Sequence, residues 1–200
     1  MKYCFIGLGY IGLPSAILFA ESGMNVLGVD IKEDLIQNLR AGNSHINEPL
    51  IDCLLKNNIN SGRLTISDKP DFADTFFITV PTPVRNTNGN NKPNLEFVYS
   101  AIDSIIPFLK KGNKIILEST CPVGTTEKIH SMILEKKGFK DGDIFMAYCP
   151  ERVLPGNIVH ELINNERIIG GIDTSSSIKI KEIYEKICKS EIRITDCKTA

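Results

Sequence analysis

The chain has 200 residues, 42% of them hydrophobic and 24% charged, so it is long and apolar enough to bury a sizeable core. Its 23 Lys and Arg nearly balance its 24 Asp and Glu, and no basic block runs along it, so nucleic acid is not an expected partner. No apolar run reaches the roughly 18 residues that cross a bilayer, and the first residues lack the features of a secretory signal. We therefore expect no membrane partner and no secretion.

The six cysteines are scattered along the sequence, without a CxxC pair and without a histidine at metal-ligand spacing. This pattern favours neither a zinc site nor a disulfide framework. We therefore expect no metal, and reduced thiols in a cytoplasmic protein.

Apolar, β-branched runs alternate with helical patterns from one end of the chain to the other. The expected strands are Tyr3–Ile6, Asn25–Val29, Phe76–Val80, Lys114–Leu117, Ile144–Ala147, Arg167–Ile169 and Ile192–Ile194. The expected helices lie around Leu13–Ala20 and over Glu33–Arg40, Pro49–Asn57, Leu95–Phe108, Thr125–Lys137 and Ser175–Lys189. Most of the strands are continuously apolar, as strands covered on both faces are. The pattern predicts an α/β fold: a Rossmann-like, doubly wound, mostly parallel sheet with helices on both faces.

Two stretches fall outside this alternation. Arg85–Pro93 contains four Asn, a Gly and a Pro, which predicts a surface loop. Residues Thr195–Ala200 follow the last strand and have the character of the start of another element. We therefore expect the chain to be part of a longer protein.

The strongest local motif is Gly7-Leu8-Gly9-Tyr10-Ile11-Gly12, which directly follows the first strand and opens a helix. In such a loop Gly7 permits the tight turn, Gly9 lets the backbone approach a pyrophosphate, and Gly12 lets helix and strand pack closely. The helix N–H groups and dipole then face the anion. The motif predicts a dinucleotide site, although a glycine-rich turn without a ligand would carry the same residues.

Asp30 stands at the end of the second strand, eighteen residues after Gly12, where an acidic side chain accepts hydrogen bonds from the adenosine ribose. Strand, turn, helix, second strand and acid therefore fall in register, which favours the dinucleotide interpretation. An aspartate repels a 2′-phosphate, so NAD is expected rather than NADP. Lys32 would suit NADP, but a solvated lysine in the first turn of a helix is the better explanation of this residue.

Three further loops follow apolar strands, at the edge where open α/β sheets bind ligands. Val80-Pro81-Thr82-Pro83 presents a hydroxyl on a rigid backbone, or is merely a rigid turn. The hydroxyls of Glu118–Thr126 orient a water or a ribose, or cap the following helix. In the segment Tyr148–Gly156, Glu151 and Arg152 offer a carboxylate for proton transfer and a guanidinium for an anionic ligand, or form a surface ion pair.

The segments GLGYIGLP, GVD, VPTP, ESTCPVGTTEK and YCPERVLPGN occur in this order, and together they resemble the N-terminal NAD-binding domain of the UDP-glucose/GDP-mannose dehydrogenase family. The resemblance spans essentially all 200 residues. The last two segments are most similar to the bacterial branch that acts on UDP-N-acetyl-D-mannosamine. The resemblance implies oxidation of the sugar C6 alcohol to a carboxylate with two NAD⁺, in the synthesis of surface polysaccharides.

The resemblance also implies roles for individual residues. Tyr10, Ile11 and Asp30 are expected to hold the adenosine half of NAD, with Thr82 and Thr126 lining the rest of its site. Thr120 matches a threonine that positions a catalytic water, and Glu151 matches the general base. Arg152 and Val153 match positions that contact the nucleotide sugar.

Two departures limit what the chain is expected to do. Pro155 stands where UDP-glucose enzymes carry a second glutamate, which favours UDP-N-acetyl-D-mannosamine and leaves UDP-N-acetylglucosamine and UDP-glucose as alternatives. The family's nucleophilic cysteine, its Lys/Asn pair and its UDP-binding domain are expected beyond residue 200. Residues 194–200 resemble the lead-in to the central helix that makes the family's homodimer contacts.

The chain is therefore expected to be one dinucleotide-binding domain over residues 1–200, and to be inactive alone. A non-catalytic NAD-sensing module is an alternative of another class. A dehydrogenase of small hydroxy acids is disfavoured, because no histidine is placed to act as acid or base.

Overall fold

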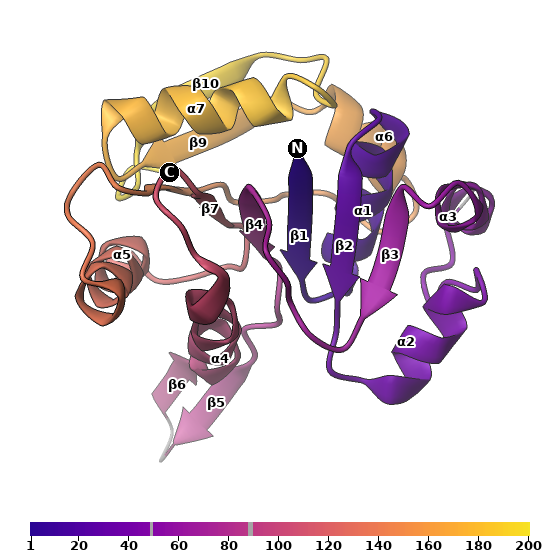
Figure 1. Cartoon of the computed structure of the whole chain (residues 1–200), viewed down its shortest axis with the longest axis horizontal. Coiled ribbons are helices and arrows are strands. Elements are labelled where there is room, and N and C mark those ends of the chain that lie inside the picture. Colours follow the sequence, from indigo (N-terminus) through magenta and orange to yellow (C-terminus); the bar gives the residue numbers. More distant parts are fainter. Residues whose placement is uncertain (49, 88–89) are drawn as a thin grey trace.

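The computed structural model describes residues 1–48, 50–87 and 90–200. Eight strands form one sheet in the order β10-β9-β8-β7-β4-β1-β2-β3 (Figure 1). Their bounds are β1 (Lys2–Ile6), β2 (Asn25–Val29), β3 (Leu64–Ser67), β4 (Thr75–Ile78), β7 (Lys114–Leu117), β8 (Phe145–Tyr148), β9 (Arg167–Gly171) and β10 (Ile192–Asp196). Six neighbouring strands are parallel to one another, namely β8, β7, β4, β1, β2 and β3. β9 is antiparallel to β8, and β10 is parallel to β9. The expectation of a mostly parallel sheet is confirmed.

Helices cover both faces of the sheet, as expected for a doubly wound fold. The helices are α1 (Gly12–Glu21), α2 (Glu33–Arg40), α3 (Ile51–Asn60), α4 (Glu96–Ile105), α5 (Thr125–Lys137), α6 (Ile158–Asn164) and α7 (Thr174–Tyr184), and a 3₁₀ turn covers Ile106–Phe108. Successive side chains of a strand point to opposite faces. Tyr3 and Phe5 of β1 therefore pack with the residues of α1, α3, α6 and α7, while Cys4 and Ile6 pack with those of α4 and α5.

An aromatic cluster fastens α1 and α7 to the middle of the sheet. The rings of Phe5 and Phe77 stack with their centroids 4.1 Å apart, and Tyr3 meets Phe19 of α1 edge-on at 5.3 Å. Tyr184, at the end of α7, meets Phe77 edge-on at 6.2 Å. All five rings are fully or almost fully buried, so the cluster contributes a large apolar area to the core.

The prediction that Arg85–Pro93 is a loop is wrong, because most of it forms an antiparallel hairpin of β5 (Val84–Thr87) and β6 (Asn90–Pro93). Residues 88 and 89 lie outside the described part of the chain. Both Nη atoms of Arg85 hydrogen-bond the carboxylate of Glu96 in α4, at 2.9 and 2.7 Å. The hairpin carries no apolar alternation that would mark its strands in the sequence, and it extends away from the sheet beyond α4 (Figure 1).

The sequence also missed two short elements, β3 and α6. The edge strand β3 has only four residues, and α6 has seven, with its first N–H bonded to the distant side chain of Glu48. The helix expected over Pro49–Asn57 is α3, which begins at Ile51, and Pro49 is not among the described residues.

Several expected boundaries differ from the structure by a few residues. The strand expected over Phe76–Val80 is β4, which runs from Thr75 to Ile78. The helix expected to reach Lys189 ends at Tyr184. At the chain end β10 continues to Asp196, whose carboxylate accepts the N–H groups of two of the next three residues. Asp196 therefore caps a short turn there, which local sequence patterning does not reveal.

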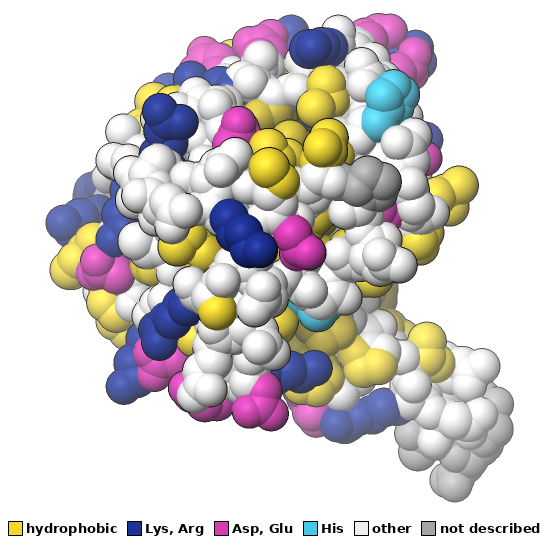
Figure 2. Space-filling model, turned by 90° about the vertical axis from the view of Figure 1, so that its right-hand side faces the viewer, with side chains coloured by type: hydrophobic (Ala, Val, Ile, Leu, Met, Phe, Trp, Pro, Cys, Tyr) yellow, Lys and Arg dark blue, Asp and Glu magenta, His cyan; other side chains and the backbone are white. Residues whose placement is uncertain are grey.

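The surface matches the balanced composition. On the face shown in Figure 2, acidic and basic side chains intermix, and the hairpin projects at the lower right. Among the described helices, none is both long and apolar enough to cross a membrane. All six cysteines are free thiols.

The aromatic cluster predicts a large effect of one substitution. We expect Phe77→Ala to lower the free energy of unfolding by about 3–5 kcal/mol, because the cavity left under α1 and α7 cannot collapse fully. Urea unfolding measures this, with Phe97→Ala as the matched control, since Phe97 is 41% exposed on α4. Equal losses in the two variants would contradict a central role for the cluster.

Candidate functional site

The loops singled out in the sequence meet at one edge of the sheet. β1, β2, β4, β7 and β8 are parallel, so the loops that follow them all begin at their common carboxyl edge. The chain order runs outward from β1 through β2 to β3 on one side and from β4 through β7 to β8 on the other. Such a reversal leaves a crevice between β1 and β4, where ligands of open α/β sheets bind.

The first glycine forms the sharp turn that the motif predicts. Gly7 has φ 97°, and its N–H donates to the carbonyl of Val29 at 2.8 Å. A Cβ on Gly7 would lie 2.8 Å from the carbonyl oxygen of Thr79. The Thr79 hydroxyl also donates to the carbonyl of Gly7 at 2.7 Å, so the residue after β4 locks this turn. Sequence analysis missed Thr79, although its place next to the Val80-Pro81 turn put it at the edge.

The other two glycines are required for different reasons. A Cβ on Gly12 would collide with the carbonyl oxygen of Gly7 and lie 2.5 Å from the hydroxyl oxygen of Thr79, so α1 packs here without room for a side chain. A Cβ on Gly9 would meet no atom of the described residues within 4 Å. Across the described residues, the N–H groups of Gly9, Tyr10 and Ile11 find no acceptor. The loop therefore offers open space lined by free donors, which fits a pyrophosphate.

Asp30 ties the glycine loop to the end of β2. Its Oδ2 accepts the N–H of Leu8 at 2.9 Å and its Oδ1 accepts the N–H of Lys32 at 3.1 Å. Each carboxylate oxygen keeps a further lone pair that can accept a ribose hydroxyl. Tyr10 is 46% exposed and Ile11 is half-buried in the loop that Asp30 holds. These residues fit the adenosine half of a dinucleotide.

The threonines of the edge lie in different environments. Thr82 is half-buried after β4, and Thr120 is exposed after β7. Thr126 is buried in the first turn of α5 and lines a hollow of about 290 Å³ together with Tyr148. The N-cap residue before α5 is Gly124, and among the described residues no side-chain cap hydrogen bond is made there, so the structure does not support the alternative that the hydroxyls of this segment cap the helix.

The Glu151 carboxylate forms an ion pair with Arg167, a residue that the sequence did not indicate as part of the site. The Glu151 side chain is 8% exposed, and its Oε2 lies 2.8 Å from Nη2 of Arg167. Its Oε1 accepts the N–H of Arg152 at 2.7 Å, while the Arg152 guanidinium donates to the carbonyl of Glu166. The alternative of a surface ion pair between Glu151 and Arg152 is therefore wrong. Val153, the next residue, is half-buried.

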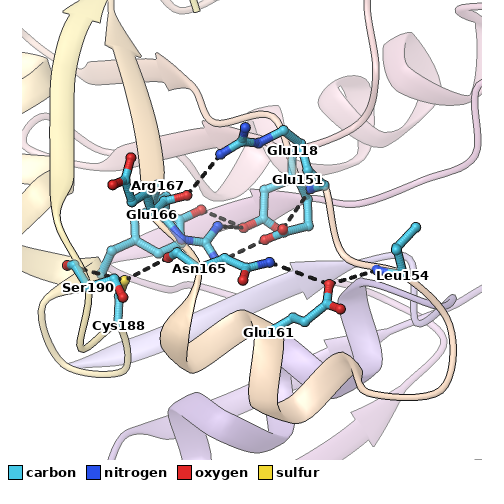
Figure 3. Close-up of polar contacts among 11 residues, drawn as sticks. Glu118, Glu151, Leu154, Glu161, Asn165, Glu166, Arg167, Cys188 and Ser190 are labelled. Carbon is cyan, nitrogen blue, oxygen red and sulfur yellow. Dashed lines mark hydrogen bonds and ion pairs between the residues drawn. The ribbon is translucent and has the colours of Figure 1, made fainter.

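Arg167 lies in a buried polar cluster with Glu118 and Glu151 (Figure 3), and Tyr184 also belongs to this cluster because its ring lies under the guanidinium. The Tyr184 hydroxyl donates to Oε1 of Glu118 at 2.5 Å, and Nη1 of Arg167 lies 3.8 Å from the same oxygen. Burial raises the pKa of the Glu118 carboxyl to about 7, although the charge of Arg167 and the Tyr184 hydrogen bond act against this rise. Sequence analysis missed Arg167 and Tyr184, and the only signal was an arginine at the start of an apolar strand.

The buried carboxylate of Glu48 bonds the backbone at the end of the loop that contains Glu151. Glu48 is 9% exposed, and its two oxygens accept the N–H groups of Gly156 and Ile158. The N–H of Leu154 donates to Glu161 at 2.9 Å. The loop is thus anchored at several points although most of its side chains are exposed. Sequence analysis missed Glu48, and nothing local in the sequence marks it.

A hollow of about 300 Å³ also opens at the opposite, amino edge of the sheet, where Lys2 and Lys110 are among its lining residues. None of the residues proposed from the sequence lies there, so the carboxyl edge remains the candidate site. Within the described ranges, no group of three or more His, Cys, Asp or Glu side chains is arranged to hold a metal ion.

The raised pKa of Glu118 predicts a pH-dependent stability. The folded chain binds a proton at Glu118 that the unfolded chain releases above pH 4.5, so stability is lost as pH rises from 4.5 toward 7. Relative to Glu118→Gln, we expect the free energy of unfolding of the wild type to fall by on the order of 3 kcal/mol across this range. Urea unfolding at a series of pH values measures the difference.

The comparison with Glu118→Gln isolates this one group. Burial lowers the pKa of His45 and of His130, and both histidines are present in the two proteins, so their contributions cancel. A difference that stays constant between pH 4.5 and 7 would show that Glu118 is not protonated in the folded chain.

Comparisons with known proteins agree with this geometry. The profile of the "UDP-glucose/GDP-mannose dehydrogenase family, NAD binding domain" matches residues 1–188. The UDP-N-acetyl-D-mannosamine dehydrogenase of Methanocaldococcus jannaschii is 47% identical over 199 residues, which cover 100% of this chain and 45% of that protein. The enzyme of the same name from Escherichia coli is 41% identical over 203 residues, covering 98% of this chain and 48% of that protein.

A solved structure is also very similar. The UDP-N-acetyl-mannosamine dehydrogenase of Staphylococcus aureus superposes with a TM-score of 0.96 at 42% identity, covering 100% of this chain and 48% of that one. The chain spans about half the length of these relatives. With a family profile that matches nearly its whole length, and with a glycine loop and acid that fit a dinucleotide, the chain belongs to the UDP-glucose/GDP-mannose dehydrogenase family and corresponds to its NAD-binding domain.

Proposed function

We propose that this chain is the N-terminal part of a longer, cytoplasmic nucleotide-sugar 6-dehydrogenase that oxidises UDP-N-acetyl-D-mannosamine to the uronate with two NAD⁺. The single observation that carries the cofactor part is the open space at Gly9, flanked by free backbone N–H groups and bounded by two glycines that the packing requires. The names of the most similar relatives, and Pro155 in place of a second glutamate, support the choice of sugar.

In this proposal the edge of the sheet binds both halves of the cofactor. The pyrophosphate lies against the N–H groups at Gly9, and Asp30 accepts hydrogen bonds from the adenosine ribose. Tyr10 and Ile11 flank the adenosine, while Thr82 and Thr126 line the nicotinamide half of the site. When bound, NAD⁺ supplies the acceptor for the hydride that leaves C6 of the sugar.

Other residues of the same edge bind the sugar, accept its proton and orient a water molecule in this proposal. Glu151 is a shielded carboxylate at the same edge and accepts the proton of the reacting hydroxyl. The exposed Thr120 hydroxyl orients the water that supplies the second oxygen of the carboxylate product. Arg152 and Val153 contact the nucleotide sugar, on the loop that Glu48 fastens.

The buried position of Glu151 favours an enzyme over a module that only senses NAD. A sensing module needs the glycine loop and Asp30 but has no use for a carboxylate held by a buried arginine at the same edge of the sheet. The remaining catalytic groups, and the contacts of the homodimer that the family resemblance implies, belong in this proposal to segments beyond residue 200.

The glycine loop gives a sharp test of cofactor binding. We expect Gly9→Val to lower the affinity for NAD⁺ at least tenfold, about 1.4 kcal/mol, because the new side chain fills the space that the pyrophosphate needs. Its free energy of unfolding should change by no more than about 0.5 kcal/mol, because none of the described residues comes within 4 Å of the added Cβ. Calorimetric titration and urea unfolding of the 200-residue chain measure the two effects.

Gly12→Ala is the matched contrast, because its Cβ collides with backbone and should destabilise the fold by about 1–3 kcal/mol. The same titration with NADP⁺ should show weaker binding than NAD⁺, since Asp30 repels a 2′-phosphate. Undiminished NAD⁺ binding by Gly9→Val would place the cofactor elsewhere.

The sugar substrate is tested in the longer protein. We expect two NADH to form for each UDP-N-acetyl-D-mannosamine consumed, and Glu151→Gln to lower kcat by about 100-fold or more, because an amide cannot accept the proton. Absorbance of NADH and analysis of the product measure both. UDP-glucose and UDP-N-acetylglucosamine serve as comparison substrates, and faster turnover of either would correct the assignment of the sugar.

A further inference from the structure

The reversal of strand direction at β9 places an arginine directly beside Glu151. Ala147 pairs with Gly171 and Tyr148 with Gly170 in the antiparallel ladder between β8 and β9. Glu151 follows Tyr148 by three residues and Arg167 precedes Gly170 by three, so the same register sets them opposite each other. A parallel strand in this place would bring its last residue to the edge, and not its first.

Arg167 is immobilised on several sides. Its side chain is 5% exposed, and its guanidinium lies over the ring of Tyr184 at 4.4 Å from the ring centre. The Tyr184 hydroxyl holds Glu118, whose Oε1 lies 3.8 Å from Nη1 of Arg167. Figure 3 shows the carboxyl groups of Glu118 and Glu151 converging on this guanidinium.

This cluster is poorly explained by stability alone. Two carboxyl groups and one guanidinium are taken out of water, which costs several kcal/mol for each ion unless every polar atom is satisfied. Within the described residues, Nε and Nη1 of Arg167, Oε2 of Glu118 and Oε2 of Glu151 have no hydrogen-bond partner, so the 2.8 Å contact between Oε2 of Glu151 and Nη2 of Arg167 is an ion pair. Apolar side chains of the same volume would serve a purely structural role at least as well, so the arrangement points to a function.

The consequence for Glu151 is a fixed carboxylate orientation. Oε2 forms an ion pair with Nη2 of Arg167, and Oε1 accepts the N–H of Arg152. The anchors of the segment that follows hold the backbone at Leu154, Gly156 and Ile158, three or more residues beyond Glu151, so they do not fix the direction of its carboxylate. A planar guanidinium can bond one carboxylate and stack on a ring at once, which a lysine ammonium cannot reproduce.

We propose that Arg167 is the positioning residue for Glu151, and that Glu118 and Tyr184 hold Arg167 in place for this purpose. The inference rests on the proposed function, in which Glu151 accepts the proton of the sugar hydroxyl. Arg167 itself touches neither substrate nor cofactor in this scheme. It acts by holding Oε2, so that the lone pair that receives the proton keeps one direction.

The test measures kcat and KM for variants of Arg167 in the longer protein. Each substrate, NAD⁺ and the UDP-sugar, is varied while the other is kept saturating. We expect Arg167→Met to lower kcat about 100-fold, as a misplaced reacting group does, while KM for NAD⁺ stays within about twofold of the wild type. Arg167→Lys should recover part of kcat, because it restores a cation near Oε2. Tyr184→Phe, which keeps the arginine and the ring, should show a smaller loss and covers the case in which Arg167→Met fails to fold.

Arg193→Met is the matched control, since Arg193 lies on the neighbouring β10, is 59% exposed, and pairs only with the surface residues Glu166 and Glu191 within the part of the chain described. Its kcat and KM should equal those of the wild type. An Arg167→Met protein as active as this control, or one that loses NAD⁺ affinity together with kcat, overturns the positioning role. If the wild-type protein neither binds NAD⁺ nor oxidises any UDP-sugar, the proposed function has failed instead.

Discussion

The close approach of α1 to the end of β1 is the constraint on which the candidate site depends. At Gly12 the helix touches the Gly7 carbonyl and the Thr79 hydroxyl so closely that no side chain fits between them. This contact brings the first turn of α1 to the point where the strand order reverses. Because the helix cannot move back, the N–H groups before it remain at the crevice, and their partial positive charge faces an anion bound there.

A second constraint comes from the direction of β9. The parallel strands bring their terminal loops to one edge, yet the side chain that holds Glu151 comes from the first residue of an antiparallel strand. β9 and β10 therefore run opposite to the other six strands, and Arg167 reaches this edge as the first residue of β9. The same reversal sets Tyr184, at the end of α7, under the arginine and joins the aromatic core to the polar cluster.

Local signals in the sequence were sufficient for most of the fold and for the cofactor loop. Apolar runs marked seven of the eight sheet strands. The spacing of Gly7, Gly9, Gly12 and Asp30 predicted the tight turn and the close approach of α1 to β1, because that geometry is determined by residues within this short segment. The polar hairpin, β3 and α6 escaped because short or polar elements carry no strong periodicity.

The supporting side chains of the site escaped for a different reason. Glu48 bonds an N–H that is 108 residues away, and Thr79 bonds a carbonyl 72 residues away. Such contacts are properties of the folded sheet edge, so no window of sequence contains both partners. Carboxylates bond loop N–H groups at two loops of this edge. Asp30 bonds the glycine loop, whereas Glu161 and Glu48 bond the middle and the end of the loop that contains Glu151. A carboxylate accepts several N–H groups at once, which lets an exposed loop keep one conformation where the edge offers no further strand to bond it.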